Sequence, residues 1–136
     1  MTSLTKLFCG IILITVPTIQ YGGYFLLTIL SGKSKLQVTD FQKSMFRAGH
    51  AHAGVLVILA LLAQILIDYA AFNYTFEIIV RICFILAPIL ISGGFFGGAA
   101  GKNITKPTPL ISILYIGIFI LAASVITLGI ALIKNS

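Results

Sequence analysis

Charged residues are scarce in this chain, and acidic residues are the scarcest of them. Among 136 residues there are nine Lys or Arg and three acids, Asp40, Asp68 and Glu77, so that charged residues make up 9% of the chain. A soluble domain carries about 25%. The acids supply no paired carboxylates inside an apolar segment, and no nucleophile elbow, phosphate-binding loop or zinc-protease motif occurs. The sequence is therefore not typical of an enzyme.

Cysteine and histidine are also rare, with two residues of each. Cys9 and Cys83 belong to no Cys-x-x-Cys spacing, so the sequence predicts neither a disulfide framework nor a cysteine metal site. We expect both to be small residues that face lipid or a neighbouring helix.

Hydrophobic residues make up 59% of the chain, and the mean hydropathy is +1.12. A soluble protein of this composition would expose apolar patches and aggregate. A helix needs about 20 apolar residues to cross a hydrocarbon core of about 30 Å. Four charge-free stretches qualify, bounded by Lys6 and Lys33, Arg47 and Asp68, Arg81 and Lys102, and Lys106 and Lys134. We therefore predict an all-α, polytopic membrane protein, a four-transmembrane-helix bundle in a single domain, 1–136, with helices over about 7–29, 47–69, 76–98 and 110–133.

The first apolar stretch differs from the others because polar and helix-weakening residues lie at its centre. It continues to Leu30, beyond the roughly 7–15 apolar residues of a signal peptide, so we expect it to be retained. Pro17 and the pair Gly22-Gly23 predict a kink. Gln20 is costly at mid-membrane depth without a partner, so we expect this face to lie toward the bundle, either for close packing or to line a ligand site.

Two loops carry signals for helix ends. Thr39 or Asp40 is suited to cap the second helix, which we expect to begin near Asp40 and to enter the membrane near Ala48. Between the third and fourth helices, Pro107 and Pro109 prevent a continuous helix.

Basic residues are distributed unequally between the two sides of the predicted bundle. One side has six and the other three: Lys33, Lys35, Lys43, Arg47, Lys102 and Lys106, against Lys6, Arg81 and Lys134. Because cytoplasmic loops carry the excess of Lys and Arg, we expect a cell-membrane protein with the first side in the cytoplasm and both termini outside. The net charge of +6 then indicates contacts with anionic lipids of the bilayer, and we expect no nucleic-acid partner, since no motif supports one.

Both histidines lie near the predicted cytoplasmic end of the second helix, in the segment 47–54. At 100° per residue their rings are about 200° apart, so they cannot both bind one ion within a regular helix. Arg47, Gln64 and Asp68 share the side of His50. We therefore expect His50 to point into the bundle and His52 toward another helix or a neighbouring subunit. The alternative is an ordinary structural role, with both rings bonded to hydroxyl groups or interfacial water.

A second polar group is predicted at the opposite end of the second helix. If the turn to the third helix is centred near Tyr74, Asp68 and Arg81 lie at equal depth. Glu77 precedes Arg81 by four residues, which is the favourable order for a helix ion pair. Because intramembrane charges need partners, we predict a structural ion cluster of Asp68, Glu77 and Arg81, with a proton or substrate relay as the alternative.

The same depth scale places the histidines beside residues 97–99 of the third helix, at the level of Tyr24 and Tyr115. Two glycine pairs there have the small-xxx-small spacing that brings helices close together: Gly93 with Gly97, and Gly94 with Gly98. Tight packing is one interpretation of this region. The other is a polar pocket for a cofactor or a lipid headgroup, with the tyrosines in its wall.

The string Arg-x-Gly-His-Ala-His-Ala-Gly at residues 47–54 resembles the His-x-His helices of the haem- and copper-containing membrane proteins related to respiratory oxidase subunit I. The likeness covers these eight residues alone. It implies that His50 and His52 hold haem or a transition metal, and Arg47, Tyr24 and Tyr115 are the further candidate contacts to such a cofactor. That family's histidines on other helices are missing here, so a site would need a second copy, an open axial position or a partner subunit.

Three functions remain open at this point. The first is a haem-, metal- or quinone-associated membrane protein that uses His50, His52 and Arg47. The second is a small transporter or permeation unit, lined by the polar stripe of the second helix and the kinked first helix. The third is an accessory subunit that packs into a larger membrane complex, or a homo-oligomer, through its glycine faces.

Overall fold

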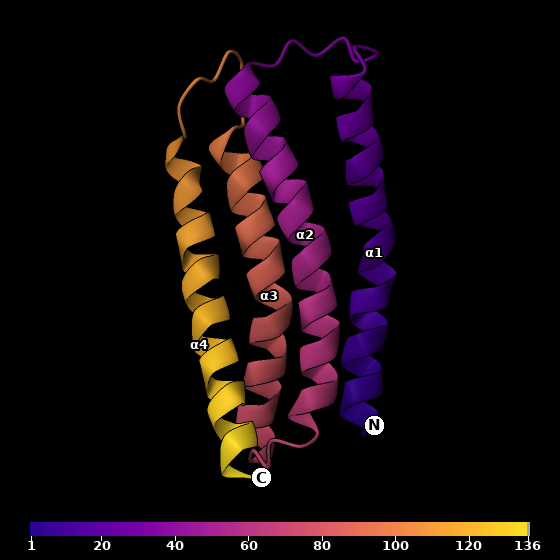
Figure 1. Ribbon diagram of the computed structural model, residues 1–136, viewed down its shortest axis with the longest axis vertical. Coiled ribbons are helices and arrows are strands. Elements are labelled where there is room, and N and C mark those ends of the chain that lie inside the picture. The colour runs from indigo at the N-terminus through magenta and orange to yellow at the C-terminus, as the bar shows by residue number, and fades with distance from the viewer. Residues whose placement is uncertain (136) are drawn as a thin grey trace.

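The computed structural model describes residues 1–135, and within them the chain forms four long helices side by side (Figure 1). These are α1 (Ser3–Leu30), α2 (Asp40–Ile67), α3 (Tyr74–Gly98) and α4 (Ser112–Lys134), with a short 3₁₀ turn, η1 (Pro109–Ile111), before α4. All four are long and apolar enough to cross a membrane. The predicted all-α bundle of four membrane-spanning helices is therefore confirmed.

The helices alternate in direction, so the bundle has two different ends (Figure 1). The α1–α2 and α3–α4 loops lie at one end, near six of the nine basic residues, and we call it the basic end. The α2–α3 turn lies at the other, with the first residues of α1 and the last of α4. We call this the ion-pair end, because Asp68, Glu77 and Arg81 meet there.

Short polar side chains begin three of the helices. Thr2, Thr39 and Asn73 each accept a hydrogen bond from the backbone N–H three residues later, which satisfies a donor that the helix itself leaves unpaired. Of the two residues predicted to cap α2, Thr39 is the cap, and Gln42 completes a capping box with it. Pro109 begins the turn that leads into α4.

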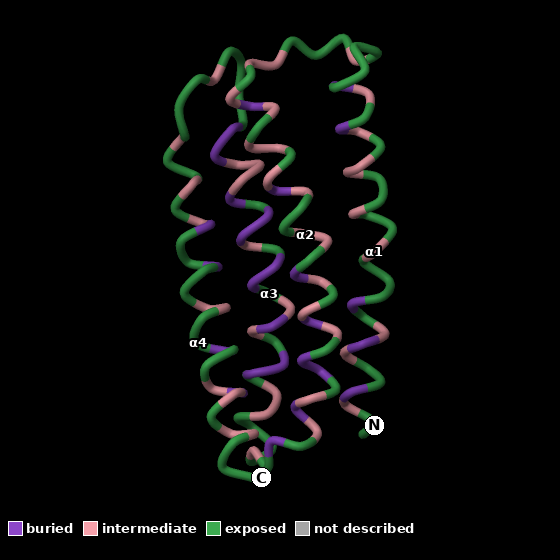
Figure 2. The backbone as a smooth tube through the Cα atoms, in the orientation of Figure 1, coloured by how far each residue is buried: buried purple, intermediate pink, exposed green. Residues whose placement is uncertain are grey.

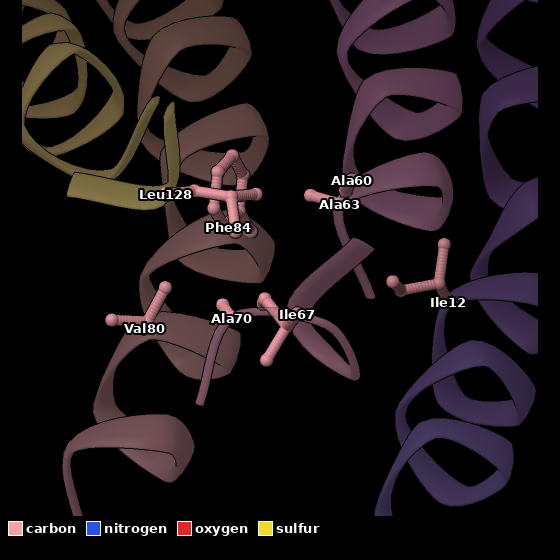
Figure 3. Packing of buried hydrophobic residues seen from close by; sticks show 8 residues of the cluster. All are labelled: Ile12, Ala60, Ala63, Ile67, Ala70, Val80, Phe84 and Leu128. Carbon is pink, nitrogen blue, oxygen red and sulfur yellow. The ribbon is translucent and has the colours of Figure 1, made fainter. Parts of the chain in front are cut away.

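The four helices follow one another across the bundle in chain order, with α1 packed on α2, α2 on α3, and α3 on α4. Burial is accordingly concentrated on α2 and α3, while α1 and α4 expose most of their surfaces (Figure 2). A cluster of buried apolar residues lies toward the ion-pair end (Figure 3); it consists of Ile12, Ala60, Ala63, Ile67, Ala70, Val80, Phe84 and Leu128.

Glycines bring α3 and α4 into backbone contact. A Cβ added to Gly94 would lie 2.3 Å from the backbone nitrogen of Leu114, and one added to Gly117 would lie 2.8 Å from that of Ile91. Gly98 likewise packs against Ile111. The interpretation of the predicted glycine pairs as a tight contact therefore applies to Gly94, Gly97 and Gly98, because a Cβ on Gly97 would lie 3.3 Å from that of Leu110, whereas one on Gly93 would have no neighbour within 4 Å.

The expectation for the polar centre of α1 is half wrong. Gly22 and Gly23 do face α2, but Gln20 is exposed, and the Tyr21 side chain is 72% exposed. The reason is that α1 packs mainly on α2, so only one narrow stripe of α1 is covered.

Candidate functional site

Arg81 is fully buried at the ion-pair end, and five hydrogen bonds match its five guanidinium N–H groups. Nε and Nη2 donate to Oε1 of Glu77 at 2.9 and 2.7 Å, and Nη2 also donates to Oδ1 of Asp68 at 2.8 Å. Nη1 donates to the main-chain and side-chain oxygens of Gln64 at 2.9 and 3.1 Å. The predicted ion cluster is therefore formed, and it includes Gln64.

The end of α2 explains why Gln64 takes part. The N–H of Asp68 bonds to the carbonyl of Ile65 at 3.3 Å, so the carbonyl of Gln64, in the last turn, is free to accept from Arg81. A cation at a helix C-terminus also interacts favourably with the helix dipole. The Gln64 side chain returns the contact by donating to the main-chain oxygen of Arg81 at 3.1 Å. Arg81 thus serves as the C-terminal cap of α2.

Asp68 extends this cluster to α1. Its carboxylate accepts hydrogen bonds from the Thr2 N–H and hydroxyl, both at 3.1 Å, and from the Thr5 hydroxyl. Burial raises the pKa of Asp68, but the hydrogen bonds from Thr5, Arg81 and Thr2 outweigh it and lower the pKa from 3.8 to about 2. One carboxylate therefore holds α1, α2 and α3 together at the ion-pair end.

His50 points into the bundle, as predicted, and its ring lies against α1. A Cβ added to Gly23 would lie 3.1 Å from Nε2, and one added to Gly22 would lie 3.7 Å from Nδ1. The two glycines thus make a notch for the imidazole between α1 and α2. The Nε2 edge of the ring therefore faces the α1 backbone at Gly23.

His52 is exposed on another side of α2. Its Nδ1 lies 2.8 Å from the carbonyl oxygen of Ala48, and its ring centroid is 4.9 Å from that of Phe95. Since a carbonyl can only accept, His52 donates through Nδ1. Within residues 1–135 no three His, Cys, Asp or Glu side chains lie together as metal ligands. The histidine pair does not fit a haem or metal site built from one chain.

The remaining predicted contacts are not brought together. Tyr24 on α1 and Tyr115 on α4 are each 64% exposed, and they lie on the two outer helices. Arg47 is exposed as well. The predicted pocket also assumed that the turn between α2 and α3 is centred near Tyr74. In the structure α3 begins at Tyr74, so the turn is centred before it and the residues paired by depth are shifted. The structure consequently does not form that pocket.

A cavity of about 290 Å³ lies instead between α1, α2 and α3, midway between the two ends. Its α2 wall is Ala53, Val57 and Ala60, which continue the stripe of His50 at helical spacing toward Gln64. The full lining is Ile12, Thr15, Thr18, Ile19, Ala53, Val57, Ala60, Ile85, Pro88, Ile89 and Ser92. We call this cavity the groove. It interrupts the polar stripe predicted along α2 with an apolar segment.

The groove is closed differently at its two ends. Toward the basic end lie the His50 notch and a series of rings from three helices, in which Phe46 lies 6.4 Å from Phe25 and 5.5 Å from Phe96, centroid to centroid. Toward the ion-pair end lies the apolar cluster, and the ion pairs of Arg81 lie at that same end of the bundle. The groove is partly open to the surroundings.

Ser92 distinguishes the groove from an ordinary packing gap. The residue is 8% exposed, and among the described residues its hydroxyl is the buried side-chain atom that lacks a hydrogen-bond partner. Other helical hydroxyls donate back to a carbonyl three or four residues earlier, as Thr28 does to Phe25 and Ser124 to Ile120. An unpaired buried hydroxyl costs free energy unless a ligand or water supplies its partner.

Sequence reasoning missed the groove and Ser92. A serine four residues after Pro88 in an apolar helix was a visible signal, because polar groups inside a membrane need partners. The missing hydrogen bond itself could not be read from the sequence. No protein-family model, curated protein or solved structure matches this chain.

Proposed function

We propose that this membrane protein binds a small, neutral, largely apolar molecule that enters the groove from the bilayer. The unpaired hydroxyl of Ser92, buried in a mostly aliphatic wall, is the observation that carries the proposal. Ligand sites commonly combine an apolar lining with a few polar groups that fix orientation. The lining contains no charged residue, which favours a neutral ligand over an ion.

Two features support a ligand site in the groove: its walls are held in place, and its volume suits a small molecule. The three helices that line the groove are tied to one another on both sides of it, by the Arg81–Asp68 hydrogen bonds and by the Phe25, Phe46 and Phe96 rings. Its volume, about 290 Å³, lies at the lower limit of ligand pockets, which are about 300–1,000 Å³. The site therefore suits a molecule of one or two rings better than a whole phospholipid.

A binding assay with 1-naphthol as the probe tests this function. In phosphatidylcholine nanodiscs, the protein should bind 1-naphthol saturably, measured by the probe's fluorescence against empty nanodiscs. Ala53→Phe places a ring in the groove and should abolish saturable binding, and Ala53→Leu should weaken it. Ala51→Phe is the matched control, because Ala51 is exposed on the same helix. Purely linear partitioning, or equal binding by the Ala53 and Ala51 variants, would overturn the proposal.

A second candidate, assembly into a homo-oligomer or a larger membrane complex, rests on Gln20. Its amide is exposed near the middle of α1. An amide facing hydrocarbon is costly, and a second copy of α1 supplies both a donor and an acceptor for it. Gln20→Leu should then lower the association measured by photobleaching steps in nanodiscs. Gln37→Leu, in the α1–α2 loop, is the control, and equal association in both variants would exclude this contact.

We also propose that the protein lies in the cell membrane with its basic end in the cytoplasm. Six basic residues against one acid at that end, and three against two at the other, support this orientation. In a variant with Cys9 and Cys83 replaced by Ala, single cysteines at positions 35 and 102 should react with an impermeant maleimide only after permeabilisation. Labelling of both in intact cells would reverse the orientation, and labelling of only one would overturn the four-span topology.

A further inference from the structure

We infer that the ligand of the groove carries a hydroxyl group, as an alcohol or a phenol does. This inference rests on the proposed binding function and specifies the chemistry that the site would select. It follows from which hydroxyl groups of the lining already donate a hydrogen bond to a carbonyl of their own helix and which does not.

Thr15 and Thr18, which are both exposed on α1, line the α1 side of the groove. The Thr15 hydroxyl donates to the carbonyl of Ile12 at 2.7 Å, and the Thr18 hydroxyl donates to that of Thr15 at 2.6 Å. A hydroxyl has one hydrogen and two lone pairs, so these two oxygens have no hydrogen left to give and can still accept. A molecule in the groove satisfies them only by supplying a donor.

Ser92 and Pro88 complete the set on the α3 side. The Ser92 hydroxyl is unpaired and can donate or accept. Pro88 has no N–H, so it adds no backbone donor to this wall. The lining therefore offers the two threonine oxygens as acceptors and the Ser92 hydroxyl as its free donor.

This imbalance separates ligand classes. A ketone, ether or quinone can accept from Ser92 but has no hydrogen for Thr15 or Thr18. A hydroxyl can accept from Ser92 and donate to a threonine oxygen, so it uses both kinds of group. Because a specific site rejects a ligand that leaves its polar groups unpaired, we expect the groove to prefer the alcohol or phenol.

Three probes with one ring system test the inference: 1-naphthol, 1-methoxynaphthalene and 1,4-naphthoquinone. Binding is measured in phosphatidylcholine nanodiscs and corrected for each probe's partitioning into empty nanodiscs. The wild-type protein should bind 1-naphthol about tenfold more tightly than 1-methoxynaphthalene, as one net hydrogen bond predicts. The quinone should also bind more weakly than 1-naphthol.

Variants identify the groups that produce the preference. Ser92→Ala and Thr15→Val should each reduce it toward equal binding. Thr28→Val removes the same kind of helix-bonded hydroxyl outside the groove and should leave it unchanged. Saturable binding with equal or tighter affinity for the methoxy probe or the quinone would overturn the hydroxyl inference while the binding function stands. Absence of saturable binding by all three probes would overturn both.

Discussion

The two ends of the bundle join the same helices by different means. At each end a buried glutamine of α2 bonds to the backbone of α3 or the segment that follows it. Gln42 donates to the carbonyls of Ala99 and Gly101, both at 2.9 Å, whereas Gln64 donates to that of Arg81. At the ion-pair end, charges surround the glutamine. At the basic end, α2 contacts its neighbouring helices through the rings of Phe46 and His50, and most of the basic side chains lie outside the core.

The difference shows where directional bonds are needed. Charged hydrogen bonds fix a small set of atoms closely but are costly if one partner is lost. Ring packing is less directional and tolerates small shifts. The first residues of α1 are therefore tied to Asp68, while its later residues contact α2 through His50 and Phe46. If a ligand enters the groove, we expect the part of α1 near the basic end to move more easily than the part near the ion-pair end.

Loss of Arg81 should have the largest effect. Arg81→Leu leaves the Glu77 carboxylate and the Gln64 carbonyl without their donor and removes the cation paired with Asp68, which should destabilise the protein by about 3–5 kcal/mol. Folded yield and the thermal unfolding midpoint in mild detergent measure this, with Lys134→Leu as the control. If both variants kept wild-type stability, Arg81 would be reaching water rather than capping α2.

Acid should weaken the ion-pair end selectively. The pKa of Asp68 is lowered from 3.8 to about 2 in the folded protein, so its stabilising contribution is complete above about pH 4 and is lost as the pH falls toward 2. Unfolding midpoints measured between pH 5 and pH 2 should therefore fall for the wild type. Asp68→Asn should be less stable at pH 5 but flatter across this range, and an unchanged slope would assign the acid response to other groups.

The two histidines should be unequal. His50→Ala empties the notch beside Gly22 and Gly23 and should cost about 1–2 kcal/mol of stability. His52→Ala removes an exposed ring and should cost less than about 0.5 kcal/mol. The order is read from unfolding midpoints, and a larger loss for His52 would show that its outward face is covered by another subunit.

Neutralising the basic loops should have the smallest effect on stability. Lys33→Gln and Lys35→Gln lie in an exposed loop, so each should change stability by no more than about 0.5 kcal/mol. Enrichment of anionic lipid around the protein in mixed-lipid nanodiscs should nevertheless weaken, measured against the wild type at the same salt concentration. A stability loss comparable with that of His50→Ala would mean that the α1–α2 loop supports the bundle.

Much of the architecture was predictable from the sequence because the bilayer restricts the choices. Charge-free stretches of sufficient length predict the helices, and the short connection places Asp68 and Arg81 at the same end of the bundle. The faces of α1 were harder to predict, since Gln20 and Tyr24 look inward only if α1 has neighbours on several sides. The groove depends on side-chain orientations in three helices at once, which no single segment of sequence specifies.

The capping of α2 by Arg81 has a consequence for biosynthesis. An α3 helix entering the bilayer alone would carry a guanidinium with no acceptors beyond its own Glu77, at a substantial cost. The other acceptors, on Gln64 and Asp68, are synthesised first and lie just across a short turn. We therefore expect α2 and α3 to leave the insertion machinery together as a hairpin in which the guanidinium is already paired. The fourth helix, which needs only the glycine surface of α3, can follow afterwards.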